Sequence, residues 1–132
     1  MRRVAICIFY TSDKKILLQD RRNISKFGEQ WGFFGGSIEE GENPEQAVVR
    51  EIFEELEYKL INYKFFKKYG AILPSDQESE AYVFVAEFPG FEKLHQHEGD
   101  DMKLFSFEEA CQKLTEWDHQ MPTDVETSLE TH

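Results

Sequence analysis

Residues 36–58 read GSIEEGENPEQAVVREIFEELEY, and this stretch carries the strongest helix signal in the chain. Asn43 is a good N-cap residue, and Pro44 suits the first position of a helix. Gln46 stands three residues after Asn43, which is the spacing of a capping box. Together these signals predict a helix from Pro44 to about Leu56.

Three glutamates, Glu51, Glu54 and Glu55, fall at positions i, i+3 and i+4 of this helix, within about 100° of one another around its axis. Such a cluster repels itself, and it lies near the helix C-terminus, where the helix dipole disfavours anions. A divalent cation would relieve the repulsion. Pairing of Arg50 with Glu54 on an ordinary solvated helix face would also relieve the repulsion. The sequence of the helix alone does not distinguish these two explanations. The apolar residues expected on the opposite face are Val49, Ile52, Phe53 and Leu56.

The remaining segments predict a sheet on both sides of this helix. Residues 31–34 are expected to be extended and are followed by the Gly35-Gly36 pair, with a loop to Glu42. Capping boxes also open a helix from Ser106 to about Leu114 and, at Thr123 with Glu126, a final short helix. The other expected strands are 4–10, 16–19, 63–69, 80–88 and 102–105. This order is typical of a mixed α/β sandwich.

The bulk composition limits the possible functions. A chain of 132 residues fits one domain, and its 12 phenylalanines supply a core. The net charge of -11 argues against general binding of nucleic acid, and no stretch is long enough to span a membrane. Cys7 and Cys111 show neither zinc spacing nor a disulfide framework, so we expect reduced thiols and a cytoplasmic protein.

The segment from Gly36 to Tyr58 resembles the Nudix box. The box asks for Gly, five residues, Glu, seven residues, and then Arg-Glu-apolar-any-Glu-Glu-any-Gly-apolar. Glu57 replaces the second Gly, which normally ends the helix in a left-handed conformation, at a cost on the order of 1 kcal/mol or with a different helix end. The positions that match are Gly36, Glu42, Arg50, Glu51, Ile52, Glu54, Glu55 and Tyr58. The resemblance to this MutT-like hydrolase family implies a single domain over residues 1–132 with an α/β/α sandwich and a mixed sheet.

The resemblance also implies the chemistry of the site. In this family, helix glutamates bind Mg²⁺, for which Mn²⁺ can substitute, and water attacks one phosphorus of a diphosphate. Carried onto this chain, Glu54 and Glu55 are metal ligands, Glu51 is a ligand or a base, and the Gly36 carbonyl supplies a further ligand. Arg50 then orients a glutamate, and Glu42 fastens the loop to the helix.

The family often adds a carboxylate from a downstream loop. Glu98 is our choice for this ligand or general base, with Asp100 and Asp101 as competitors and a solvated acidic loop as the ordinary alternative. The expected substrate-binding residues are Arg21, Arg22 and Phe33. The expected catalytic set is Glu51, Glu54, Glu55, Arg50 and Glu98, and the expected metal ligands are Gly36, Glu51, Glu54, Glu55 and Glu98.

Three functions follow from this resemblance. The leading one is hydrolysis of a nucleoside triphosphate, ordinary or oxidised, to a monophosphate and pyrophosphate. The second is cleavage of a nucleoside diphosphate sugar, such as ADP-ribose or a GDP-sugar. The third is a module that binds nucleotides without hydrolysis, although all four box glutamates are present here. Related domains often form homodimers, which we keep as an expectation.

Overall fold

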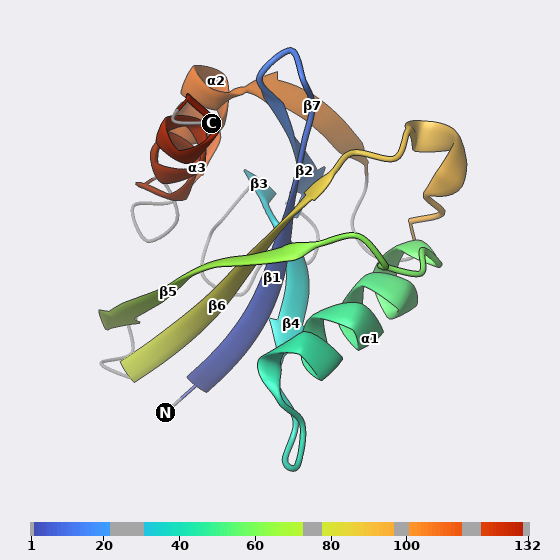
Figure 1. The fold of residues 1–132 in the computed structure, drawn as a ribbon, viewed down its shortest axis with the longest axis vertical. Helices are drawn as coiled ribbons and strands as arrows, with labels where there is room; N and C mark the ends of the chain where they lie inside the picture. The colour runs from blue at the N-terminus through green and yellow to red at the C-terminus, as the bar shows by residue number, and fades with distance from the viewer. Residues whose placement is uncertain (1, 22–30, 73–77, 97–100, 115–119, 131–132) are drawn as a thin grey trace.

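A computed structural model describes residues 2–21, 31–72, 78–96, 101–114 and 120–130 (Figure 1). Seven strands form one sheet, with one long helix after the fourth strand and two helices near the C-terminus. The elements are β1 Arg2–Tyr10, β2 Lys15–Asp20, β3 Trp31–Gly32, β4 Phe34–Ser37, α1 Pro44–Leu56, β5 Lys64–Ile72, β6 Glu78–Glu87, the 3₁₀ helix Phe91–Lys93, β7 Met102–Ser106, α2 Phe107–Lys113 and α3 Gln120–Glu130.

The sheet is mixed and is organised around β1. One edge of β1 pairs along its whole length with β6, in parallel, and β5 continues the sheet antiparallel to β6. The other edge is divided between two strands: β4 pairs antiparallel with Val4–Cys7, and β2 pairs antiparallel at Tyr10. β2 then carries β3 and β7. The sheet therefore forks between β2 and β4.

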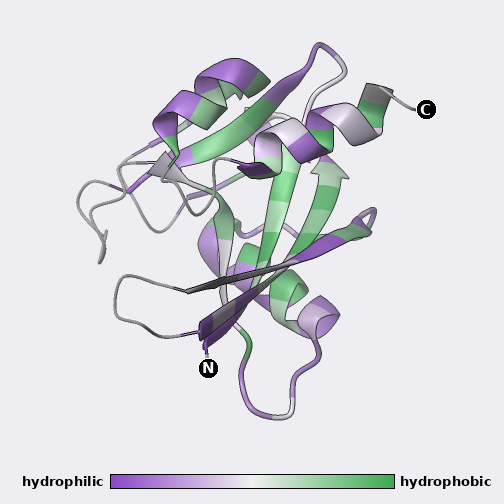
Figure 2. Cartoon of the chain, turned by 90° about the vertical axis from the view of Figure 1, so that its left-hand side faces the viewer, coloured by the Kyte–Doolittle hydropathy of each residue, from purple (hydrophilic) through white to green (hydrophobic). Residues whose placement is uncertain are grey.

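The two faces of the sheet are covered by different helices, as Figure 1 shows with α1 on one side and α2 and α3 on the other. Alternate residues of β1 face opposite sides, as a strand requires. Ala5, Cys7 and Phe9 belong to the core under α1, whereas Ile8 belongs to the core under α2 and α3. In Figure 2 the central strands between the helices are mainly green, whereas strand segments near the end marked N are purple. This arrangement confirms the predicted α/β/α sandwich with a mixed sheet.

Helix α1 begins and ends where the sequence predicts. The Gln46 N–H donates to the Asn43 side chain at 2.8 Å, and the Asn43 N–H donates to the Gln46 side chain at 3.0 Å, which completes the capping box. At the other end, Glu57 adopts the left-handed conformation, with φ 52° and ψ 29°, and its N–H donates to the Phe53 carbonyl at 2.9 Å. The glutamate therefore takes the same backbone conformation as the glycine that it replaces.

The faces of α1 differ from the prediction at two positions. Glu55 is buried, with 5% of its surface exposed, whereas Phe53 is 56% exposed. The buried stripe runs through Val48, Ile52 and Leu56, and Glu55 lies three residues after Ile52 on that stripe. Phe53 lies about 100° away from Ile52 around the helix. One glutamate of the cluster is thus held between the helix and the sheet and does not lie on the solvent face.

Two further boundaries differ from the prediction. The Gly35-Gly36 pair lies inside strand β4 because both residues pair with β1, opposite Ile6 and Ala5. Helix α3 begins at Gln120, so Thr123 lies inside the helix and its carbonyl accepts a hydrogen bond from Thr127 Oγ1 at 2.9 Å. The capping box at Ser106 is present as predicted. Among the described residues, no helix has the length and apolar character needed to cross a membrane.

Candidate functional site

Arg50 of α1 stands at the centre of a cluster of carboxylates. Its Nε and Nη2 donate to the two carboxylate oxygens of Glu42, at 2.7 and 3.0 Å. Its Nη1 donates to Glu51 at 2.9 Å and to Glu54 at 3.3 Å. Nη2 also donates to the Ser37 carbonyl at 3.0 Å. One guanidinium therefore ties the loop before α1, the end of β4 and two glutamates of α1 together.

These contacts shift the pKa values of both partners. The hydrogen bonds from Arg50, together with one from the Glu39 N–H, lower the pKa of Glu42 to about 2. The pKa of Arg50 is raised chiefly by the hydrogen bond to Glu42. Burial opposes this shift, and the hydrogen bond to Glu51 adds to it. Both groups stay charged at neutral pH. The contacts of Glu42 are those expected of a residue that fastens the loop to the helix.

The glycine pair of β4 lets α1 approach the sheet closely. A Cβ atom on Gly36 would lie 2.5–2.6 Å from the carboxylate atoms of Glu51, so no larger residue fits there without moving that side chain. Gly35 has φ +146°, and a Cβ atom on it would lie 2.2 Å from the Ala5 carbonyl oxygen. The Gly35 N–H donates to Glu55 Oε2 at 3.2 Å. Two glutamates of α1 therefore rest directly on the backbone of β4.

The pairing of β4 with β1 decides which peptide groups face these side chains. The Ile38 N–H donates to the Arg3 carbonyl at 2.9 Å, which makes these two residues a hydrogen-bonded pair. Gly36 lies two residues earlier, opposite Ala5, so its peptide groups also face β1. The peptide groups of Gly35 face the outer edge of β4. The sequence suggested the Gly36 carbonyl as a metal ligand. In the hydrogen-bond pattern between β4 and β1, however, the carbonyl that faces away from β1 is that of Gly35.

Side chains from two elements bind this outer edge of β4. In order along the chain, the carbonyl of Phe33, the residue just before β4, accepts from Gln19 Nε2 at 2.9 Å, the Gly35 N–H donates to Glu55, and the Ser37 carbonyl accepts from Arg50. Gln19 lies on β2, and the other two side chains come from α1. The edge strand is thus held by side-chain hydrogen bonds in place of a neighbouring strand.

The oxygen atoms at this edge are of the chemical type that a hard divalent cation binds. Mg²⁺ prefers carboxylate and carbonyl oxygens, which Glu51, Glu54, Glu55 and the Gly35 carbonyl offer. Glu55 is nearly buried, and a buried carboxylate needs a partner to remain charged. Within the described ranges, no three His, Cys, Asp or Glu side chains lie close enough together to hold an ion. The guanidinium of Arg50 lies between several of the carboxylates and offsets their charge.

Other residues predicted for the site lie elsewhere or outside the described part of the chain. The ring of Phe33 is only 7% exposed and belongs to the core under α2 and α3, so this placement does not support a contact with substrate. Arg21 lies against Gly32, where its Cδ would be 2.7 Å from an added Cβ atom. Asp101 is exposed, and its side chain accepts from the Met102 N–H at 2.8 Å. Arg22, Glu98 and Asp100 lie outside the described residues.

Sequence reasoning missed Gln19, which is fully buried and reaches the edge of β4. Asp20 beside it is also buried, with 2% of its surface exposed, and its N–H donates to the Asp101 carbonyl at 2.7 Å. The feature of the sequence that could have indicated them is that Gln19 and Asp20 are two polar residues at the end of β2, directly after the apolar residues 16–18.

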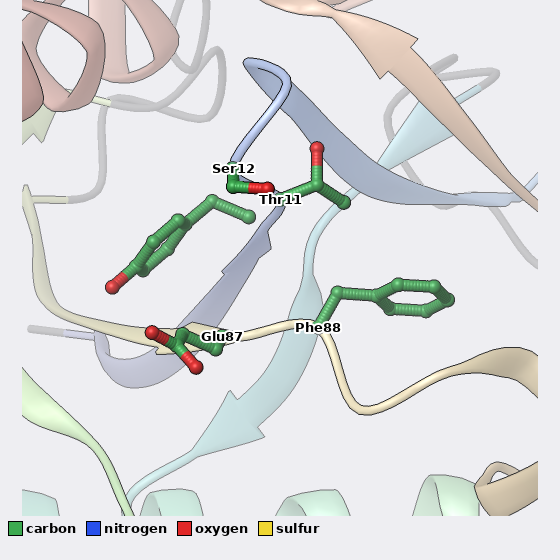
Figure 3. Close-up of a pocket in the computed structure, with 5 residues that line it drawn as sticks. Thr11, Ser12, Glu87 and Phe88 are labelled. Carbon is green, nitrogen blue, oxygen red and sulfur yellow. The ribbon is translucent and has the colours of Figure 1, made fainter.

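A pocket of about 280 Å³ lies at the turn between β1 and β2, away from the carboxylates. It is lined by Tyr10, Thr11, Ser12, Glu87 and Phe88. Figure 3 shows Thr11 and Ser12 on the turn and Glu87 and Phe88 on the strand end opposite. Tyr10 lies five residues along β1 from Ala5, the partner of Gly36, which is about 16 Å at the rise of a strand. The pocket is therefore separate from the carboxylate cluster.

Comparison with known proteins agrees with this geometry. The sequence profile of the NUDIX domain matches residues 1–124. The NAD-capped RNA hydrolase NudC of Mannheimia succiniciproducens is 30% identical over 85% of this chain, which corresponds to 42% of that protein. The 8-oxo-dGTP diphosphatase of Escherichia coli is 35% identical over 49% of this chain and 50% of its own length. The chain thus spans half or less of the length of these two relatives.

Among solved structures, the Escherichia coli ORF135 protein superimposes with a TM-score of 0.78 and is 29% identical, over 96% of this chain and 89% of that one. The profile match covers the carboxylate helix, the glycine pair and α2, and it ends within α3. The chain therefore belongs to the Nudix family of MutT-like hydrolases.

Proposed function

We propose that this chain is a Mg²⁺-dependent pyrophosphohydrolase that cleaves a diphosphate linkage in a nucleoside triphosphate, ordinary or oxidised, to a monophosphate and pyrophosphate. The observation that carries the proposal is the set of α1 glutamates: Glu51 and Glu55 lie against the glycine pair of β4, and Arg50 joins Glu54 to Glu51. The similarity to an 8-oxo-dGTP diphosphatase supports the choice of substrate class.

The charge of the protein explains why a metal is needed. With a net charge of -11 and a cluster of glutamates at the site, the protein repels a polyphosphate unless a cation intervenes. When bound, a divalent ion offsets phosphate charge and lowers the pKa of a coordinated water. The residues proposed to hold it are Glu51, Glu54 and Glu55, with the Gly35 carbonyl in place of that of Gly36.

The other residues of the cluster have positioning roles. Arg50 donates to Glu51 and Glu54 and keeps both carboxylates oriented, while its paired hydrogen bonds to Glu42 fix the guanidinium itself. The Gly35 N–H donates to Oε2 of Glu55 and so helps to orient this carboxylate. Preorganised groups of this kind avoid the cost of reorganisation during the reaction.

A second substrate class is a diphosphate that joins a nucleoside to another group, including a nucleoside diphosphate sugar such as ADP-ribose. The observation in its favour is that a relative matching 85% of this chain is named an NAD-capped RNA hydrolase. A binding module without hydrolysis is disfavoured, because all four box glutamates are present and Arg50 contacts three of them.

The test is a panel of nucleoside triphosphates, 8-oxo-dGTP, ADP-ribose, GDP-sugars and NAD, each incubated with Mg²⁺ or with EDTA. We expect Mg²⁺-dependent release of a monophosphate from at least one of them. The Glu54→Gln, Glu55→Gln double variant should be slower by about a hundredfold or more. Glu45→Gln, a matched change in the first turn of the same helix, should retain activity. Turnover that survives both EDTA and the double substitution would refute the assignment.

A further inference from the structure

Gln19 of β2 has no role in the Nudix box, yet it is fully buried. The three residues before it, Ile16, Leu17 and Leu18, are buried apolar side chains of the two cores. The Gln19 Nε2 donates to the Phe33 carbonyl at 2.9 Å, while its Oε1 has no hydrogen-bond partner among the described residues. Burying a polar atom without a partner is costly, so packing alone does not account for an amide here.

The position of this amide links it to the proposed metal site. Gln19 lies in the fork of the sheet, where β2 and β4 separate after sharing one edge of β1. Gln19 binds the carbonyl of Phe33, the residue just before β4, and the Gly35 N–H, two residues further along the chain, binds Glu55. Any shift of Phe33 therefore moves the peptide group that holds Glu55.

We propose that Gln19 is a positioning residue for the metal-binding carboxylates, an inference that rests on the proposed function. Its Nε2–H fixes the edge of β4, and through that edge it sets the place of the Gly35 peptide and of Glu55. Its Oε1 is buried and lacks a hydrogen-bond partner among the described residues, and we assign to it an enclosed water molecule as donor. An amide supplies both functions, whereas an apolar side chain supplies neither.

A purely structural role predicts something different. If Gln19 only fastens the fork, its replacement changes the unfolding temperature and leaves metal binding unchanged. If it positions the site, metal binding changes even where the unfolding temperature does not. Partners that orient metal ligands typically change metal affinity by about 10–100-fold when they are removed.

The test measures Mn²⁺ binding by electron paramagnetic resonance, without substrate, in the whole protein. Gln19→Met keeps the length and approximate volume of the side chain and removes both polar atoms. Leu18→Met is the matched control, because Leu18 is the adjacent buried residue and faces the other core. We expect the Mn²⁺ dissociation constant to rise about tenfold or more in Gln19→Met and to stay within about twofold in Leu18→Met. A dissociation constant for Gln19→Met equal to that of the wild type overturns the proposal.

A second measurement needs no variant and applies if Gln19→Met does not fold. In the wild-type protein labelled with ¹⁵N, titration with Mg²⁺ should shift the side-chain amide signals of Gln19 and the backbone signal of Gly35 with the same half-saturation. A Gln19 signal that stays fixed while Gly35 shifts contradicts the inference alone. Wild-type protein that neither binds Mn²⁺ nor responds to Mg²⁺ contradicts the proposed function as well.

Discussion

The left-handed residue at the end of α1 gives a direct prediction about stability. Glu57 has φ 52° and ψ 29°, where an L-residue with a Cβ atom is disfavoured by about 1–2 kcal/mol. Glycine removes that strain, but it adds about 0.5–1 kcal/mol of backbone entropy to the unfolded chain. Glu57→Gly should therefore stabilise the protein by about 0.5–1 kcal/mol. For a domain of this size, that raises the unfolding temperature by about 2–5 °C.

The assay is thermal and urea unfolding of the wild type, Glu57→Gly and Glu57→Ala. The alanine variant keeps the Cβ atom and loses the rest of the side chain, so the difference between the two variants measures the backbone strain minus the added entropy of glycine in the unfolded chain. Glu57→Gly should be the most stable of the three proteins. If it unfolds at the same temperature and urea concentration as Glu57→Ala, the reasoning about the helix end is refuted.

Three further predictions concern the site. Gly36→Ala places a Cβ atom about 2.5 Å from the Glu51 carboxylate, so kcat should fall about a hundredfold, and wild-type kinetics would contradict this. In Arg50→Lys, the lysine cannot form paired hydrogen bonds to Glu42 and also reach the Ser37 carbonyl, so kcat should fall about tenfold or more. An unchanged kcat would contradict the positioning role of Arg50. The depressed pKa of Glu42 means that its ion pair contributes stability above pH 4.5, its ordinary value, and loses that contribution as the pH falls toward about 2. The difference in the free energy of unfolding between wild type and Glu42→Gln, measured by denaturation with urea, should therefore shrink below pH 4.5. A difference that stays constant with pH would refute the lowered pKa of Glu42.

Local signals predicted the helices well because they act within one turn. The residues that cap α1 and α2 were read from spacing alone, and both capping boxes are present. The same reasoning placed the end of α1 correctly at Leu56. It failed at Thr123, because α3 begins at Gln120 and the threonine lies inside its first turns.

The arrangement of the site depends on contacts that are distant in sequence. The spacing of Glu51, Glu54 and Glu55 predicted one acidic face, but the burial of Glu55 follows from how α1 packs on β4. The choice between Gly35 and Gly36 depends on the register of β4 against β1, which a shift of one residue would reverse.

The contact made by Gln19 is even harder to predict from sequence. It forms only because β2 and β4 separate at this point, which brings the Gln19 amide to the Phe33 carbonyl. A search of the sequence for acidic or basic clusters does not find a neutral amide inside a strand. The burial of Oε1, without a partner in the part of the chain that the structure describes, becomes visible only after folding.

We propose that the acidic side chains of α1 bind a divalent cation at the edge of β4. The most direct measurement is anomalous diffraction from a crystal soaked in Mn²⁺, which locates the ion without relying on any choice of substrate. We expect a peak at about 2–2.5 Å from carboxylate oxygens of Glu51, Glu54 or Glu55 and from the Gly35 carbonyl. A soaked crystal with no peak at those oxygens, or with Mn²⁺ bound only elsewhere, would contradict it.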